Sequence, residues 1–192
     1  LYKTTWFNFL LPPELRCYFY TKTNSDRLNK DDLFSLTEFA LICFEELDGM
    51  RPAELNQLKA MATMPYVNER AAYGRNKERH PHIASFCGTG NNVQFLTDPT
   101  GNRRWLPFEV SQIRDPHLHA IPYELVYSQA YALWKSGFCH WFSQEEIRKL
   151  NMHNSRFEVP NLEEDLIRTH FRKPFEGEAG IFVTAADILE QI

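Results

Sequence analysis

The stretch Phe39-Ala40-Leu41-Ile42-Cys43-Phe44-Glu45-Glu46-Leu47-Asp48 decides the fold, because six apolar residues lead directly into a pair of carboxylates. An apolar run too short for a typical helix, without polar alternation, is typical of a parallel strand covered on both faces. Open α/β sheets bind their ligands at the carboxyl ends of such strands. Glu45 and Glu46 would repel each other there, and a nucleotide-bound Mg²⁺ is the usual cation between such acids. A plain turn at Asp48-Gly49 is the alternative interpretation.

A Lys-Thr pair opens the first predicted helix. Lys3-Thr4-Thr5 precedes a segment, residues 6–11, that is predicted to be helical until Pro12-Pro13 ends it. Lys followed by Thr at a helix start is the second half of the phosphate-binding loop G-x-x-x-x-G-K-[ST]. There the Lys contacts the β- and γ-phosphates and the hydroxyl binds Mg²⁺. The glycines are absent and the chain begins with Leu1, so we expect the sequence to start inside the motif, without the upstream strand.

Composition places the chain among soluble globular proteins. Its 192 residues are 43% hydrophobic and 24% charged, enough for one domain and a small appendage. No apolar run is long enough to span a membrane, and no signal peptide is visible. The net charge of −4 argues against a uniformly basic coat, so any contact with nucleic acid must be local.

The cysteines and histidines give little indication of a metal site. Four widely spaced cysteines form no C-x-x-C pair, which favours a reducing, cytoplasmic environment, and Cys43 and Cys87 fall in predicted buried strands. Two H-x-H spacings, at 80–82 and 117–119, would need a third ligand from elsewhere, and no nearby Cys completes a set.

A helix and a basic segment follow the acid strand. Arg51-Pro52 is predicted to open a helix, and Lys59 lies off its apolar face, as a solvated helix charge would. Residues 66–81 are dense in cations and aromatics, a composition that could track a phosphate backbone or stack bases. The alternative is a solvated hairpin with surface ion pairs to Glu69 and Glu78. The apolar face is formed by Leu55, Leu58, Met61 and Ala62, and the basic segment contains Tyr66, Arg70, Tyr73, Arg75, Lys77, Arg79 and His80.

Two further segments carry candidate site residues. A predicted strand at 82–87 ends in Gly88-Thr89-Gly90-Asn91-Asn92, where Asn91 is placed to orient a water or contact a γ-phosphate, although Gly-Asn is also ordinary turn chemistry. Arg103-Arg104 leads into residues 105–110, which are predicted to form an edge strand because they contain Pro107. Neighbouring side chains on a strand point to opposite faces, so at most one arginine can reach the ligand edge, and the other could face a neighbouring subunit.

The whole pattern predicts a three-layer α/β fold with a mostly parallel sheet. Residues 1–141 would form the core, and residues 142–192 a helical C-terminal part compatible with the start of a winged-helix-like subdomain. The other expected elements are a strand at 16–20 and helices at 31–35, 121–137, 143–151, 161–170 and 185–192.

Taken together, these residues resemble the virulence-associated protein E family, P-loop ATPases of prophages and mobile elements that are related to superfamily 3 and poxvirus-type helicases. The most specific piece is Asp98-Pro99-Thr100-Gly101-Asn102-Arg103-Arg104 before an aromatic residue and a Pro. The resemblance extends from Lys3 to about Trp141. The other matching pieces are Lys3-Thr4-Thr5, Phe44-Glu45-Glu46-Leu47-Asp48, Leu58-Lys59, Tyr73-Gly74-Arg75 and Ala84-Ser85-Phe86-Cys87-Gly88-Thr89-Gly90-Asn91.

The resemblance implies a role for each matching residue. Lys3 would bind phosphate, with Thr4 as the Mg²⁺ ligand. Glu45 and Glu46 would supply the metal-side acid and the water-activating base, in an order that stays open because the relatives commonly carry Asp at the metal position. Asn91 would be the sensor of the γ-phosphate. Arg103 or Arg104 would be an arginine finger that acts across a subunit boundary, which implies a ring, commonly a hexamer.

The resemblance also implies that Lys59 and the segment Tyr73 to Arg79, including Arg75 and Lys77, grip single-stranded DNA. The leading hypothesis is therefore an ATP- and Mg²⁺-dependent motor, a helicase-like part of a mobile-element primase-helicase; whether a primase domain lies upstream stays open. The alternative is a nucleotide-dependent nucleic-acid-binding module or switch without efficient hydrolysis. A metal-dependent nuclease built on Glu45, Glu46 and Asp48, with Lys59 assisting, is disfavoured because it leaves Lys3 and the two arginines without roles.

Overall fold

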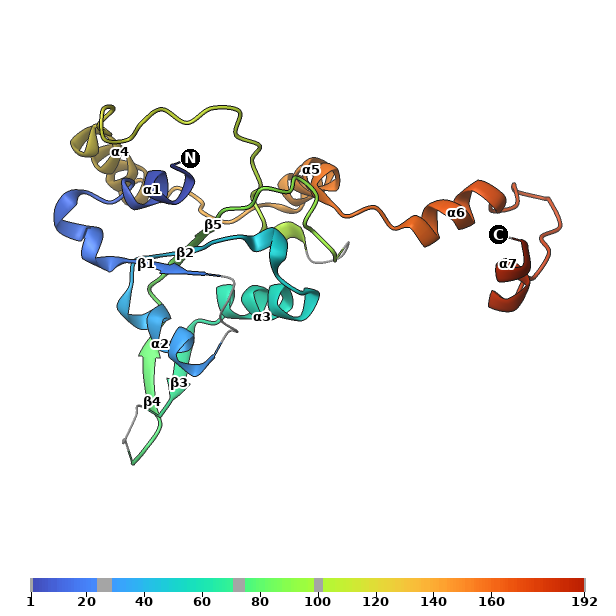
Figure 1. Ribbon diagram of the computed structural model, residues 1–192, viewed down its shortest axis with the longest axis horizontal. Helices are drawn as coiled ribbons and strands as arrows, with labels where there is room; N and C mark the ends of the chain where they lie inside the picture. The colour runs from blue at the N-terminus through green and yellow to red at the C-terminus, as the bar shows by residue number, and fades with distance from the viewer. Residues whose placement is uncertain (1, 24–28, 71–74, 99–101, 192) are drawn as a thin grey trace.

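A computed structural model describes residues 2–23, 29–70, 75–98 and 102–191. Helices and strands alternate through the first half of the chain, whereas the second half contains helices and long irregular connections (Figure 1). The elements are α1 (Lys3–Asn8), η1 (Pro13–Tyr18), β1 (Phe19–Lys22), α2 (Lys30–Glu38), β2 (Leu41–Phe44), η2 (Leu47–Gly49), α3 (Pro52–Ala62), β3 (Tyr66–Glu69), β4 (Glu78–Pro81), β5 (Ser85–Gly88), η3 (Asn102–Arg104), α4 (Tyr123–Lys135), α5 (Gln144–Asn154), η4 (Ser155–Phe157), α6 (Leu162–His170) and α7 (Ala185–Gln191).

The central sheet is parallel and has the order β1-β2-β5. Cys43 of β2 is aligned with Thr21 of β1 on one side and with Cys87 of β5 on the other. Helix α1 lies on one side of the sheet, and α2 and α3 lie on the other (Figure 1). The predicted α/β class, with a parallel sheet that has helices on both sides, is therefore confirmed, and the acid strand is its middle strand.

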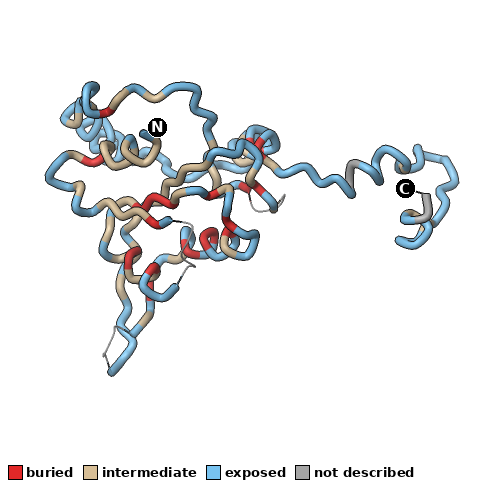
Figure 2. Tube along the Cα trace, viewed as in Figure 1, coloured by how far each residue is buried: buried red, intermediate tan, exposed pale blue. Residues whose placement is uncertain are grey.

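The hydrophobic core lies between the sheet and the layer formed by α2 and α3. Pro52 opens α3, and the predicted apolar face is buried except for Ala62, which is exposed. The buried positions concentrate in the body of the molecule and are scarce in the C-terminal helices (Figure 2). The core residues are Leu36, Ile42, Phe44, Leu47, Met50, Leu55, Leu58, Met61 and Val67.

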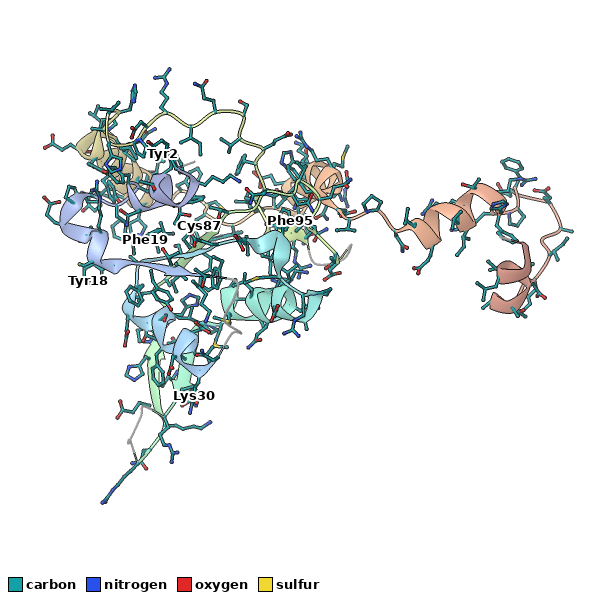
Figure 3. The ribbon with its side chains drawn as sticks, in the orientation of Figure 1. Tyr2, Tyr18, Phe19, Lys30, Cys87 and Phe95 are labelled. Carbon is teal, nitrogen blue, oxygen red and sulfur yellow. The ribbon has the colours of Figure 1, made fainter. Side chains whose placement is uncertain are left out.

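Two thiols meet inside the sheet. Cys43 is buried and Cys87 is half-buried, and Figure 3 shows Cys87 near the middle of the body, between α1 and α3. The hydrogen bond with Cys43, together with burial, raises the pKa of the Cys87 thiol above its ordinary value. The Cys87 thiol therefore remains protonated at neutral pH, and both side chains act as small hydrophobic groups, as predicted for cysteines in buried strands.

The region expected to be basic forms an antiparallel hairpin of β3 and β4 that projects from the body on the side away from α1 (Figure 1). Its base is anchored by Val67, which is fully buried in the core. An ion pair joins Lys30 of α2 to Glu69, with Nζ 3.0 Å from Oε2 (Figure 3). Glu78 is the other acid that was expected to form a surface ion pair, and its Oε2 lies 3.4 Å from Nε2 of His80 on the same strand.

The strand predicted at 16–20 starts later than expected, and the strand predicted at 105–110 is wrong. Residues 16–18 belong to the 3-10 helix η1, which Pro13 starts, and the strand begins only at Phe19. Residues 105–110 form no strand, because the Trp105 amide turns back to the Asn102 carbonyl at 3.0 Å. The Pro107 carbonyl instead contacts Nε2 of His153 at 3.0 Å. Pro107 has no amide hydrogen for a ladder, and this segment packs against α5 rather than against a strand.

The C-terminal helices continue the chain away from the body. Helix α5 begins at the Ser143 N-cap, whose hydroxyl and Glu146 form the predicted capping box. Helices α6 and α7 extend beyond α5 and lie apart from the sheet (Figure 1). Among the helices in the described part of the chain, none combines the length and the apolar character needed to cross a bilayer.

Candidate active site

Residues from three separate segments line a cavity of about 270 Å³ at the carboxyl edge of the parallel sheet. Helix α1 contributes Lys3 and Thr4, the end of β2 contributes Glu45 and Glu46, and the loop after β5 contributes Asn91. Residues 2, 89 and 90 complete the lining. Five side chains singled out from the sequence therefore lie together, whereas Thr5, although it follows Thr4 in α1, does not line the cavity.

Hydrogen bonds connect these side chains across the elements. The Thr4 hydroxyl donates to Oε1 of Glu45 at 2.6 Å, which joins α1 to the end of β2. The Lys3 ammonium donates to Oδ1 of Asn91 at 2.7 Å and to the Gly90 carbonyl, which joins α1 to the loop after β5. The geometry gives a cation, a hydroxyl, a carboxylate and an amide around one polar space.

Glu46 has an unusual backbone that follows from its place in the turn. Its φ of 54° and ψ of 45° lie in the left-handed region, which a residue with a Cβ rarely adopts. This conformation reverses the chain after β2, so that the Leu47 amide donates to the Thr89 carbonyl at 2.9 Å. The Glu46 side chain is exposed and lines the cavity without entering the core. Such backbone strain is concentrated at functional sites.

The two arginines lie on the 3-10 helix η3, beside the sheet but outside the small cavity. Both are exposed, and within the described residues no ion pair holds either guanidinium. Arg104 lines a second, larger cavity that Lys3 also borders, whereas Arg103 does not. Arg104 therefore borders this space and Arg103 does not, although both lie on a 3-10 helix and not at the start of a strand as predicted.

The residues that hold η3 in place could not be recognised from the sequence. Asn154, at the end of α5, is fully buried, and its amide donates to the carbonyls of Asn102 at 2.8 Å and Trp105 at 3.1 Å. Glu158 accepts a hydrogen bond from Asn102 at 2.7 Å. The Phe95 backbone amide donates to the Phe157 carbonyl at 2.9 Å, which joins the segment around Phe95 to the same cluster (Figure 3). Contacts therefore run across residue 141, where the sequence suggested a division.

We expect Asn154→Ala to lower the free energy of unfolding by about 1–3 kcal/mol, because the Trp105 carbonyl loses its side-chain donor and a buried acceptor left unsatisfied costs roughly that much. The Asn102 carbonyl keeps the hydrogen bond from the Trp105 amide. Urea denaturation measures this loss. Asn151→Ala is the matched control, since Asn151 lies on the same helix and is exposed. A loss below about 0.5 kcal/mol, the usual range for surface substitutions, would contradict the structural role of Asn154.

Lys59, expected to contact DNA, is buried instead. Its side chain is 8% exposed, and its ammonium lies 3.0 Å from Oδ2 of Asp98. Asp98 opens the Asp-Pro-Thr-Gly-Asn-Arg-Arg stretch, so this ion pair ties α3 to the segment that leads into η3. The position of Lys59 fits a role in holding that segment rather than a direct grip on a nucleic acid.

The other residues expected to bind nucleic acid lie on the projecting hairpin. Arg75, Lys77 and Arg79 are all exposed. The Arg79 guanidinium stacks over the ring of Tyr66, 3.6 Å from its centroid. Tyr73 lies outside the described residues. The hairpin therefore presents a cationic and aromatic surface that is separate from the small cavity.

The donor set of the cavity suits a hard cation better than a soft one. Thr4 and Glu45 supply oxygen atoms, as Mg²⁺ prefers, and the remaining Mg²⁺ ligands in nucleotide sites are phosphates and waters. Among the described residues, no group of three His, Cys or acidic side chains could hold a metal ion without such a partner. His82, one of the H-x-H residues, uses Nδ1 to contact the Met64 carbonyl at 2.7 Å.

Fold and site together define an α/β protein with a polar cavity at the carboxyl edge of a parallel sheet. The chain belongs to the virulence-associated protein E-like domain family, whose model matches residues 1–159. A search of the curated proteins found no match. The matched region includes every element of the site and the Asn154 cluster, and it ends before α6.

Proposed function

We propose that this protein hydrolyses ATP and couples hydrolysis to the handling of single-stranded DNA, as the helicase-like part of a mobile-element primase-helicase. The observation that carries the proposal is the convergence of Lys3, Thr4, Glu45, Glu46 and Asn91 on one cavity. These residue types, contributed by a helix start and by the ends of two neighbouring parallel strands, are those that nucleoside triphosphate hydrolysis requires.

The residues divide into phosphate, metal and water functions. Lys3 would bind the β- and γ-phosphates through its ammonium, which already lies in the cavity. Thr4 and Glu45 would hold Mg²⁺, because their oxygens are 2.6 Å apart and face the same space. When bound, Mg²⁺ would neutralise charge on the phosphate oxygens. The contact with Thr4 supports Glu45 as the metal ligand, which would leave Glu46 to activate the water.

Glu46 would act as the base. Its carboxylate lines the cavity, and no hydrogen bond to another described residue fixes it. It would accept a proton from the water that attacks the γ-phosphate, while Asn91 orients that water or the phosphate through its amide. Lys3 and an arginine would stabilise the negative charge that develops in the transition state.

The finer fold proposal is a P-loop arrangement in which one more strand lies along the free edge of β5. In the described residues β5 is paired on one side only, by β2. Beside it lies a cavity of about 1140 Å³, bordered by apolar side chains of α1 such as Trp6 and Phe7 and by Leu58 of α3. A strand and a glycine loop leading into Lys3 would fill this space and supply backbone donors to the phosphates.

Subunit and DNA contacts complete the proposal. Arg103, which is exposed and absent from the lining of both cavities of its own chain, would serve as the arginine finger of a neighbour in a ring, commonly a hexamer. Arg75, Lys77 and Arg79 on the hairpin would contact the phosphate backbone of single-stranded DNA, and Tyr66 would stack on a base. The four free cysteines favour a reducing cytoplasm as the place of action.

Experiments can distinguish this proposal from two other functions. A nucleotide-dependent binding module would use the same cavity without turnover. A nuclease built on Glu45, Glu46 and Asp48 is less well supported, because Lys59 is paired with Asp98 and Asp48 binds backbone amides. Cleavage of DNA with Mg²⁺ and no nucleotide would favour the nuclease.

Replacing Lys3 by Ala tests the nucleotide site. Calorimetric titration of the full-length protein with a non-hydrolysable ATP analogue and Mg²⁺ should show affinity reduced by about 10- to 150-fold, since a hydrogen bond to a charged group contributes roughly 1.5–3 kcal/mol. Lys149→Ala is the control, because Lys149 is an exposed lysine on α5, paired with Glu145. Equal affinity of Lys3→Ala and wild type would remove Lys3 from the site.

A further inference from the structure

The turn after β2 and the loop after β5 are tied together by their backbones. The Thr89 amide donates to the Phe44 carbonyl, and the Leu47 amide donates to the Thr89 carbonyl, both at 2.9 Å. Space between the two segments is minimal: a Cβ added to Gly88 would lie 2.2 Å from Cδ1 of Leu47. The acid turn and the loop that carries Asn91 therefore form one packed unit.

Asp48 provides the side-chain link in this unit. Its Oδ2 accepts hydrogen bonds from the backbone amides of Asn91 at 3.2 Å and Asn92 at 2.9 Å. Its Oδ1 is buried and has no hydrogen-bond partner among the described residues. That oxygen lies against Gly90, where an added Cβ would be only 2.9 Å away. A carboxylate buried on this side gains its stabilisation from the two amides, so it fixes the loop strongly.

We infer that Asp48 is a positioning residue: by accepting from the backbone amides of Asn91 and Asn92, it holds the Asn91 side-chain amide against Lys3 and the acid turn. The inference rests on the proposed ATP hydrolysis at this site and adds to it a residue that does not itself line the small cavity. Asp48 follows Glu46 by two residues on the same turn. One short segment thus carries the proposed metal acid, the base and the anchor of the sensor loop.

The chemistry of the anchor sets what substitutions do. Asp48→Ala removes the acceptor of both amides, whereas Asp48→Asn keeps one side-chain oxygen that can accept them. Gly90→Ala approaches the same carboxylate from the loop and displaces it without removing any polar group, because a Cβ at 2.9 Å from Oδ1 is too close. Asp48→Ala and Gly90→Ala should therefore release Asn91, whereas Asp48→Asn should keep it in place.

The first experiment follows the two amides directly and needs no turnover. Hydrogen exchange of the full-length protein can be followed by NMR at single residues. The backbone amides of Asn91 and Asn92 should exchange at least about tenfold faster in Asp48→Ala and Gly90→Ala than in wild type, because the loop after β5 can then open without unfolding of the rest of the protein. Asp187→Ala is the matched control: it removes a carboxylate that accepts from the Thr184 amide at 2.7 Å, far from the site. Unchanged exchange at residues 91 and 92 in both variants would overturn the inference.

The second experiment asks whether the position of Asn91 matters for the reaction. ATP turnover of Asp48→Ala and Gly90→Ala should lose roughly 10- to 100-fold in kcat, the effect of a misplacement near 1 Å, with KM changed far less. Asp48→Asn should recover most of the loss. Turnover equal to wild type in variants whose amides exchange faster would overturn the positioning role. If the wild type itself shows no turnover, the proposed function fails, and the exchange experiment still decides whether Asp48 holds the loop.

Discussion

We expect Glu46→Gln to reduce ATP turnover strongly and to leave nucleotide binding intact. An amide has nearly the shape of the carboxylate but cannot accept the proton of the attacking water, and loss of such a base lowers kcat by roughly 10²- to 10⁴-fold. Binding persists because Lys3, Thr4 and Glu45, which would hold the phosphates and Mg²⁺, remain connected to the cavity. Phosphate release and calorimetric titration of the same preparation measure both quantities.

Glu38→Gln is the matched control for this variant, because Glu38 is an exposed glutamate at the end of α2. Its turnover should equal that of wild type. Glu45→Gln should differ from Glu46→Gln by raising the Mg²⁺ concentration needed for half-maximal turnover, since Glu45 is the acid that contacts Thr4. Full turnover of Glu46→Gln together with loss of turnover in Glu45→Gln would exchange the two assignments.

Arg103→Ala should lower turnover by about three to five powers of ten, the usual contribution of an arginine finger. The side chain is exposed and lies outside both cavities of its own chain, so its effect is expected on a neighbouring subunit. Mixing provides the test. Arg103→Ala subunits keep an intact nucleotide cavity, and Lys3→Ala subunits keep an intact arginine, so mixed assemblies should recover turnover that neither variant shows alone.

Arg104→Ala gives the comparison, because Arg104 borders the large cavity of its own chain. Any loss in this variant should persist after mixing with Lys3→Ala subunits, since each active cavity would still lack its own Arg104. Recovery on mixing for Arg104→Ala, with none for Arg103→Ala, would assign the finger to Arg104. Wild-type turnover in both single variants would remove the finger from the account.

The convergence at the site could be predicted from the sequence for a simple reason. Parallel strands end at one edge of a sheet, so acids after one strand and an amide after the next must lie near each other. The apolar run at 39–44 identified the first strand, and the run at 82–87 identified the second. The Lys-Thr pair at the start of α1 supplied the third component, and the structure places it in hydrogen-bond contact with the other two.

The residues that position this site could not be predicted, because their partners are distant in sequence. The ion-pair partner of the buried Lys59 is Asp98, which lies 39 positions away. Asn154 reaches Asn102 across 52 positions, and nothing in its own neighbourhood distinguishes it from an exposed helix residue. In the sequence Asp48 belongs to a turn signal, and its proposed anchoring role depends on two amides more than 40 positions later. Local patterns carry no information about such contacts.

The predicted strand at 105–110 failed for a related reason. Its apolar residues and its Pro107 fit an edge strand, but a strand needs a neighbour to pair with. In the structure this segment contacts α5 through His153. The same packing explains why contacts continue past residue 141: η3, which carries both arginines, is held by a helix from the segment assigned to the C-terminal part.

The most direct test of the central claim is phosphate release from ATP by the full-length protein, with and without single-stranded DNA, over a range of protein concentrations. We expect turnover that rises with DNA and increases more than in proportion to protein concentration, since the proposed finger acts between subunits. Tight ATP binding with no release at any DNA or protein concentration would contradict it and would identify a nucleotide-dependent binding module.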